Sequence, residues 1–217
     1  MAVITIDGPA SSGKGTVAKL VAKELGFHYL DSGSIYRALG FLIIKTNLNI
    51  NDIDKILNLI SDMDLSFINN HVILNGEDVT LLLRSEDVGM LASGIAKVPE
   101  VRARLLDFQR GFAKSPGLVT DGRDMGSVVF PNADLKVFLT ASAEKRAQRR
   151  YSQLQEHTNS GTIEAILRDI TARDRQDRER SVAPLTYDGT YRVLDNSNMS
   201  IDETVKTLIN WYKEKLK

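Results

Sequence analysis

The chain has 217 residues, of which 42% are hydrophobic and 26% charged, and these fractions are typical of a globular domain rather than a disordered, fibrous or membrane-spanning chain. Lysine plus arginine and aspartate plus glutamate each number 28, so the net charge is zero and no global field attracts the protein to nucleic acid or to an anionic membrane. Because cysteine is absent, a disulfide scaffold, a thiol nucleophile and a cysteine-bound zinc are excluded, and without a basic, apolar leader the expected location is cytoplasmic.

Five short apolar runs predict the buried strands of a parallel sheet. The first, residues 3–6, ends at Asp7-Gly8 and is followed by a helical pattern over 16–25. The other four runs are separated by helical stretches and lie at residues 27–30, 118–120, 135–139 and 191–194. This alternation predicts an α/β fold, with a five-stranded parallel sheet flanked by helices, and such sheets bind ligands at the carboxyl ends of their strands.

Two segments interrupt the alternation. Residues 65–76 contain two β-type runs that meet at Asn69-Asn70, which predicts an antiparallel hairpin within a small insertion over 41–96. A polar stretch over 151–161 lies between two helical patterns and is a candidate lid, with its tip at 158–161. The core of this single unit would then comprise residues 1–40, 97–150 and 162–217.

A glycine-rich loop, Gly8-Pro-Ala-Ser-Ser-Gly-Lys-Gly-Thr16, lies between the first strand and its helix. At that place the backbone N–H groups of the loop and of the helix N-terminus can surround a polyphosphate, while Lys14 neutralises its outer charge. The hydroxyl group of Thr16, a candidate Mg²⁺ ligand, comes one residue later than in the usual form of the motif. A turn that merely caps the helix is the alternative, and the position between strand and helix favours the phosphate site.

The segment Asp31-Ser-Gly-Ser-Ile-Tyr-Arg37 follows the second predicted strand. Its polar side chains Ser32, Tyr36 and Arg37 could bind a second anionic ligand at the adjacent strand end. When the segment is considered alone, a helix N-cap at Asp31 or Ser32 followed by a surface arginine is the favoured explanation.

The segment Asp121-Gly-Arg-Asp-Met-Gly126 follows the third predicted strand. Asp121 could hold Mg²⁺ through water, Arg123 could bind a phosphate, and Asp124 could accept a hydrogen bond from an amino group. A structural ion pair is the alternative. The position of all three phosphate-related segments at strand ends favours function.

The densest charge run continues a helical pattern over 173–180. A solvated ladder of ion pairs is the usual outcome of such a run, but a nucleoside triphosphate and an anionic acceptor would need several arginines, whose forked guanidinium groups suit phosphate oxygens. In the helix after the fourth strand, Arg146, Arg149 and Arg150 are either nucleotide contacts or plain surface. Helical geometry places Arg173, Asp177 and Arg180 on one face of the 173–180 run and Arg175 and Arg178 roughly opposite.

Four segments together resemble the bacterial cytidylate kinases, and the resemblance covers essentially the whole chain. It implies a P-loop kinase core of five parallel strands, an NMP-binding insertion and a short lid. It also implies transfer of the γ-phosphate of ATP to CMP or dCMP, with Mg²⁺ as cofactor. The segments are Gly8 to Thr16, Leu30 to Arg37, Asp121 to Pro131 and Arg173 to Pro184.

The resemblance further implies roles for individual residues, with Lys14, Arg123 and Arg180 at the reacting phosphates. Arg175 and Arg178 are added to the ATP side from helical geometry alone. The ATP phosphates would be held by Gly8, Pro9, Ala10, Ser11, Ser12, Gly13, Lys14, Gly15 and Thr16. The phosphate and ribose of CMP would contact Ser32, Tyr36, Arg37, Arg123, Arg173, Asp177 and Arg180, and the cytosine would contact Ser93, Arg102 and Asp124. From the residue patterns described above, the metal residues would be Thr16 and Asp121.

The expected partners are therefore ATP and CMP or dCMP, with neither nucleic acid nor membrane, and the expected assembly is a monomer. Two rival functions remain open at this level. One is a kinase for another small acceptor, such as AMP, UMP or a hydroxy acid. The other is a P-loop NTPase that acts as a nucleotide-binding switch or a nucleic-acid protein and hydrolyses ATP slowly whether or not CMP is present.

Overall fold

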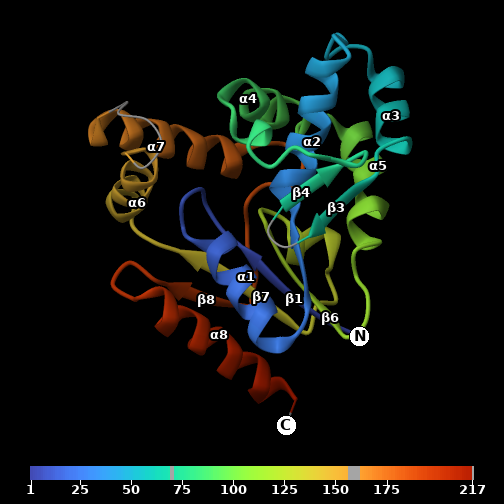
Figure 1. Cartoon of the computed structure of the whole chain (residues 1–217). Helices are drawn as coiled ribbons and strands as arrows, with labels where there is room; N and C mark the ends of the chain where they lie inside the picture. Colours follow the sequence, from blue (N-terminus) through green and yellow to red (C-terminus); the bar gives the residue numbers. More distant parts are fainter. Residues whose placement is uncertain (69–70, 156–161, 217) are drawn as a thin grey trace. The chain divides into compact units, whose positions relative to one another are not determined.

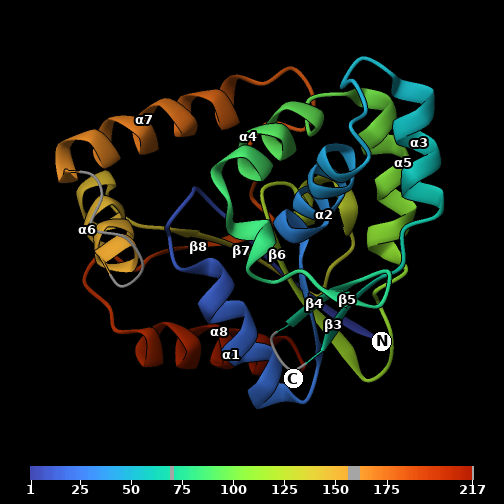
Figure 2. The same cartoon turned by 45° about the horizontal axis from the view of Figure 1, so that its top comes forward.

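The computed structural model describes residues 1–68, 71–155 and 162–216 (Figures 1 and 2). Residues 1–29 and 114–217 make up one compact unit, and residues 30–113 make up a second. The expected hairpin turn at 69–70 and most of the expected lid, 156–161, lie outside the described residues. The assignment of 41–96 to an insertion and of 151–161 to a lid stays a prediction.

The central sheet has five parallel strands, which confirms the predicted fold class. Its strands are built from short runs of β-branched and other apolar residues, which favour a sheet buried on both faces. The strand order is β2-β6-β1-β7-β8, so β1 lies in the middle with β6 and β7 on either side. The bounds are β1 (Ala2–Asp7), β2 (His28–Asp31), β6 (Gly117–Gly122), β7 (Leu135–Thr140) and β8 (Tyr191–Asp195).

Whereas α6 and α7 of the first unit pack against each other, α1 and α8 pack on this sheet and lie next to each other (Figure 1). Their apolar faces, which include Val17, Val21 and Leu208, form one core with Ile4 and Ile6 of β1. The sheet and these helices thus provide a rigid base for the loops at the strand ends. The helices are α1 (Lys14–Leu25), α6 (Ala143–Gln155), α7 (Ile163–Glu179) and α8 (Ile201–Lys215), and a π-helical turn, η2 (Met125–Val129), follows β6.

The second unit contains the predicted antiparallel element, β3 (Leu65–Ile68) and β4 (His71–Leu74). A third strand, β5 (Glu77–Asp78), which the sequence analysis did not predict, extends it to three strands. Four helices and a short 3₁₀ turn complete the unit: α2 (Ser32–Lys45), α3 (Ile53–Ser61), η1 (Leu82–Arg84), α4 (Glu86–Ile95) and α5 (Pro99–Arg110).

The end of α7 differs from the sequence expectation. The helix stops at Glu179, and Arg180 has extended backbone angles of φ −62° and ψ 138°. The chain then turns back, because the N–H group of Leu185 donates to the carbonyl group of Asp177. Arg180 therefore does not continue the helical face of Arg173 and Asp177, and the helical geometry assumed for it was wrong.

Within the described ranges, no helix has both the length and the apolar character needed to cross a membrane.

Candidate functional site

The phosphate loop connects β1 directly to α1. The last residue before the helix, Gly13, has a φ of 86°, a left-handed conformation that glycine adopts without steric cost. Glycine also offers no side-chain cap, so the N-terminus of α1 suits an anionic ligand. Lys14 begins the helix, and its Nζ atom donates to the carbonyl oxygen of Pro9 at 3.1 Å. The ammonium group of Lys14 thus lies over the loop where a polyphosphate would bind.

Two arginines of α6 hold the carbonyl groups of this loop. Arg146 donates to the oxygen of Ala10 at 3.1 Å, and Arg149 donates to the oxygen of Ser12 at 3.0 Å. Asn196, at the end of β8, also donates to Ser12, at 3.1 Å. Burial lowers the pKa of the Arg149 guanidinium group from its ordinary value. Both arginines therefore support the loop backbone from the protein side, a role that differs from either alternative offered by the sequence.

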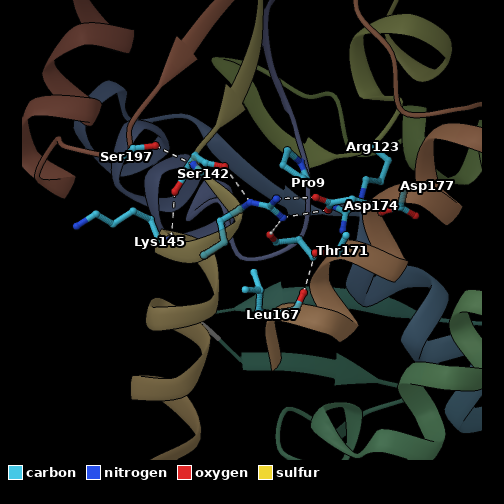
Figure 3. A network of polar contacts seen from close by, with 12 residues as sticks. Pro9, Arg123, Ser142, Lys145, Leu167, Thr171, Asp174, Asp177 and Ser197 are labelled. Carbon is cyan, nitrogen blue, oxygen red and sulfur yellow. Dashed lines mark hydrogen bonds and ion pairs between the residues drawn. The ribbon is translucent and has the colours of Figure 1, made fainter. Parts of the chain in front are cut away.

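Arg146 also forms a buried ion pair with Asp174 of α7, at 2.5 and 3.0 Å. Figure 3 shows Asp174 on this helix, near Asp177 and Arg123. Its Nε atom donates to the carbonyl oxygen of Ala141, at the junction of β7 and α6. Only 5% of the Arg146 side chain and 12% of the Asp174 side chain are exposed. One guanidinium group thus connects the phosphate loop, the start of α6 and the middle of α7.

Asp121 lies at the end of β6, on the side that faces the start of α1. A side chain at Gly15 would come within 3.7 Å of its Oδ2 atom, and Tyr29 donates to its Oδ1 atom at 2.7 Å. Thr16 follows in the first turn of α1. Among the described residues no cluster of three or more histidines, cysteines and acidic residues could hold a metal by itself. This donor set fits Mg²⁺, which usually binds one or two protein oxygens together with substrate phosphates and water.

Three arginines and two carboxylates gather beyond the end of β6. Arg123 donates to Asp177 at 2.6 Å, and a guanidinium nitrogen of Arg180 lies 4.0 Å from Oδ1 of Asp124. Burial acts to raise the pKa of Asp177, but the charges of Arg123, Arg173 and Arg180 outweigh it and hold this pKa below the ordinary value. Asp177 is therefore ionised near neutral pH, and the cluster carries a net positive charge suited to a phosphate.

The opposite face of α7 is solvated. Arg175 pairs with Glu179, one turn further along, at 3.0 Å, and 78% of the Arg175 side chain is exposed. Arg178 is exposed as well. This face matches the ion-pair ladder weighed in the sequence analysis, and contacts of these two arginines with ATP stay a prediction.

In the second unit, Asp31 caps α2 by accepting from the N–H group of Ser34, whereas Ser32 donates to the buried Gln109 at 2.8 Å. The cap explanation therefore holds for Asp31. Arg37 is more than a surface residue, because its Nη1 atom donates to the carbonyl oxygen of Leu83 at 2.7 Å.

Tyr36 and Arg102 contact each other within the same unit, the guanidinium carbon lying 5.8 Å from the ring centroid. Arg102 also donates to the carbonyl oxygen of Ala96 at 3.0 Å, and Ser93 lies on the neighbouring helix α4. The unit thus brings together Tyr36 of α2 and Arg102 of α5, and the contact of these residues and of Ser93 with CMP stays a prediction.

Sequence reasoning gave no role to Asp7, the last residue of β1. Its carboxylate is fully buried and accepts hydrogen bonds from the N–H groups of Met125 and Gly126, both at 2.8 Å, and from the hydroxyl group of Tyr191 at 3.0 Å. Burial, together with the charge of Asp124, raises the pKa of Asp7 to about 6 despite the two backbone hydrogen bonds. An acidic residue that ends an apolar run was the one available signal.

Tyr29 and Asp174 were also missed. Tyr29 reads in the sequence as part of an apolar strand, and Asp174 as one member of a mixed charge run. Their partners, Asp121 and Arg146, are 92 and 28 residues away in the chain, so local spacing carries no information about either contact.

Removing one partner of the buried pair of Arg146 and Asp174 should strongly destabilise the protein. Replacing Asp174→Asn leaves a buried guanidinium group without its counter-charge, and we expect it to lower the free energy of unfolding by about 3 to 5 kcal/mol in urea titrations. The matched control is Glu179→Gln, which removes the exposed partner of Arg175 on the same helix and should leave stability nearly unchanged. Equal effects of the two substitutions would contradict this prediction.

Asp7 should make stability depend on pH in a direction unusual for a carboxylate. Because its folded pKa lies above the ordinary 3.8, its contribution is greatest below that value and is lost as the pH rises through about 6. Relative to an Asp7→Asn variant, the wild-type protein should lose about 3 kcal/mol between acid and slightly alkaline pH. Urea unfolding of both proteins across this range measures the difference, and a constant difference would refute the raised pKa.

Comparison with known proteins gives a consistent assignment. The sequence model of the family described as cytidylate kinase matches residues 4–214. A cytidylate kinase from Ralstonia nicotianae (strain ATCC BAA-1114 / GMI1000) is 52% identical over 212 residues, which cover 98% of this chain and 92% of that protein. Another from Polynucleobacter necessarius subsp. necessarius (strain STIR1) is 49% identical over 210 residues, with 97% and 98% covered.

Among solved structures, an uncharacterized protein from Eubacterium ventriosum ATCC 27560 has a TM-score of 0.57 at 14% identity, with 98% of each chain covered. At this identity the likeness supports the fold alone. The family model matches nearly the whole chain. The relatives, at about 50% sequence identity, also align with nearly all of it. The chain therefore belongs to the cytidylate kinase family.

Proposed function

We propose that this protein transfers the γ-phosphate of ATP to CMP or dCMP, giving ADP and CDP or dCDP. It is a nucleoside monophosphate kinase, as its family membership and its relatives indicate. The observation that carries the proposal within the structure is the pairing of β1 with β6. That pairing sets Asp7, directly before the phosphate loop, opposite Gly122, directly before Arg123 and Asp124.

On the donor side, the loop N–H groups and the N-terminus of α1 would hold the ATP phosphates. Lys14 would stabilise the charge that develops on the transferring group. Thr16 and Asp121 are the residues suited to Mg²⁺, which when bound neutralises charge on the β- and γ-phosphates. The carbonyl contacts of Arg146 and Arg149 support this side by keeping the loop in one conformation.

On the acceptor side, Arg123, Arg173 and Arg180 would bind the CMP phosphate. Asp177, kept ionised by these arginines, would accept hydrogen bonds from sugar hydroxyl groups. Asp124 would accept a hydrogen bond from the amino group of cytosine and repel the carbonyl oxygen that uracil has at the same position. Ser32, Tyr36, Arg37, Ser93 and Arg102 complete the predicted acceptor contacts from the second unit.

The proposed reaction is an in-line attack of a CMP phosphate oxygen on the γ-phosphorus of ATP. The attacking phosphate is already ionised near neutral pH, so no side chain has to remove a proton from it. Catalysis then comes from positioning two anions and neutralising their charge. Lysine and arginine side chains, namely Lys14, Arg123, Arg173 and Arg180, would supply that neutralisation.

We further propose that this protein is a cytoplasmic monomer and that it binds neither nucleic acid nor membrane. The zero net charge supports the nucleic-acid part, because a phosphate-backbone partner calls for a basic surface.

The acceptor specificity is tested by ADP production from MgATP with CMP, dCMP, UMP, AMP or no acceptor. We expect rapid turnover with CMP and dCMP and little with UMP or AMP. Slow turnover that does not depend on the acceptor would support the rival P-loop NTPase. Rapid turnover with AMP or UMP alone would support a kinase for a different acceptor.

Replacing Lys14→Ala should lower kcat with every acceptor by about 10²- to 10⁴-fold, because the positive charge at the transferring phosphate is lost. Steady-state kinetics with CMP and dCMP measure the effect. Lys23→Ala, in the last turn of the same helix, is the matched control and should retain wild-type rates. A near-normal rate for Lys14→Ala would remove this residue from the catalytic site.

Replacing Asp124→Asn should reduce the preference for CMP over UMP by about tenfold or more, since an amide can donate to the uracil carbonyl oxygen as readily as it accepts from cytosine. The ratio of kcat/KM for the two acceptors is the measurement. Asp188→Asn, on the surface of the same unit, should leave the ratio as it is. An unchanged ratio in Asp124→Asn would exclude Asp124 from base recognition.

A further inference from the structure

The buried carboxylate of Asp7 has no part in the proposed mechanism, although it lies between the two halves of the site. It ends β1 and directly precedes Gly8 of the phosphate loop. Its side chain is 0% exposed, so it cannot contact a nucleotide bound at the protein surface. A buried charge with no chemical task needs a physical reason for its position.

Both oxygens of Asp7 are used by the segment that follows β6. Oδ1 accepts from the N–H group of Met125, and Oδ2 accepts from the N–H group of Gly126, each at 2.8 Å. These two N–H groups begin the π-helical turn η2, immediately after Arg123 and Asp124. We name residues 122–129 the acceptor loop, and Asp7 binds it at its centre.

A third donor reaches Asp7 from another strand. The hydroxyl group of Tyr191, the first residue of β8, donates to Oδ2 at 3.0 Å. Tyr191 is mostly buried, and burial together with the neighbouring Asp7 charge raises the pKa of its hydroxyl group above the ordinary value. The hydroxyl group therefore stays protonated and remains a donor at any physiological pH.

The acceptor loop packs so closely on this pair that position 126 has no room for a side chain. A Cβ atom on Gly126 would lie 2.6 Å from the Tyr191 hydroxyl oxygen and 2.6 Å from Oγ1 of Thr5. Contacts that short require something to shift. Steric fit and two backbone hydrogen bonds to Asp7 thus select a single position of the loop relative to β1, and Tyr191 holds the Asp7 carboxylate in place.

We propose that Asp7 and Tyr191 are positioning residues that set the acceptor loop against the phosphate loop, so that recognition of the acceptor base depends on two side chains that touch no nucleotide. This inference rests on the proposed function. The physical reason is that β1 carries the phosphate loop on its end and Asp7 ties Arg123 and Asp124 to that same end. Weakening these hydrogen bonds would displace Arg123 and Asp124, which are proposed to bind the acceptor. The phosphate loop would stay attached to β1 and α1.

The variants Asp7→Asn and Tyr191→Phe test the proposal. Asparagine has one acceptor oxygen in place of two, and phenylalanine removes one donor while keeping the ring. Asp134→Asn is the matched control for the first, because Asp134 accepts from the N–H group of Val3 at the opposite end of the same strand. Tyr187→Phe is the control for the second, a half-exposed tyrosine that packs on Phe138.

Two measurements on each purified full-length variant are compared at slightly alkaline pH, where Asp7 is ionised. The first is KM for CMP, KM for ATP and the ratio of kcat/KM between CMP and UMP. The second is hydrogen exchange of the amides of Met125 and Gly126 without nucleotide, a readout that does not require activity. Thermal unfolding reports whether each variant is folded.

For Asp7→Asn we expect exchange at the acceptor loop to accelerate, KM for CMP to rise about tenfold or more and the CMP-to-UMP ratio to fall about fivefold, with KM for ATP within about twofold of wild type. Tyr191→Phe should move the same quantities in the same direction by less. Both controls should match wild type. If Asp7→Asn does not fold, Tyr191→Phe alone carries the test, since the two backbone hydrogen bonds to Asp7 remain.

Three results would overturn the inference. The first is faster hydrogen exchange with an unchanged KM for CMP and an unchanged CMP-to-UMP ratio of kcat/KM. The second is unchanged hydrogen exchange in both variants. The third is an equal rise in KM for CMP and for ATP together with a lower melting temperature. The last would assign Asp7 to general stability. A wild-type protein that does not phosphorylate CMP would instead refute the proposed function, and the two failures are therefore distinguishable.

Discussion

The parallel pairing of β1 with β6 is the constraint on which the candidate site depends. Its register places Ile6 opposite Asp121 and Asp7 opposite Gly122, so two strands more than a hundred residues apart in sequence end side by side. Parallel strands present their carboxyl ends at one edge of the sheet, and the loops that leave those ends must share the same space. Phosphoryl transfer needs donor and acceptor phosphates held in contact, and adjacent strand ends satisfy that need without a long connecting structure.

Buried charges then give this edge of the sheet its definite geometry. The Arg146–Asp174 pair connects the phosphate loop with α7, and the Arg123–Asp177 pair connects the acceptor loop with the same helix. Asp7 joins the acceptor loop to β1. Each of these charged groups loses hydration on burial, and this cost offsets much of the free energy that the ion pairs and hydrogen bonds contribute to folding. Their common property is direction, because hydrogen bonds to charged groups tolerate little displacement and hold the loops more precisely than apolar packing would.

The charge run on α7 is divided between two environments. Asp174 and Asp177 face inward and are paired with arginines from other elements, whereas Arg175 pairs with Glu179 in solvent. Local spacing separates the two faces of the helix correctly. It does not reveal that the helix ends before Arg180, because that end depends on the turn in which Leu185 donates back to Asp177.

The sequence by itself determined the elements whose causes are local. Runs of apolar residues define the five strands, a glycine-rich turn before Lys14 defines the phosphate loop, and the residue types after each strand indicate phosphate chemistry. Only the tertiary structure decided the partners of Asp7, Tyr29 and Arg146, and with them which arginines support the loop and which face solvent. The physical reason is that strand order and register bring these groups together across large distances in the chain, and hydrophobic periodicity contains no information about which strand ends become neighbours.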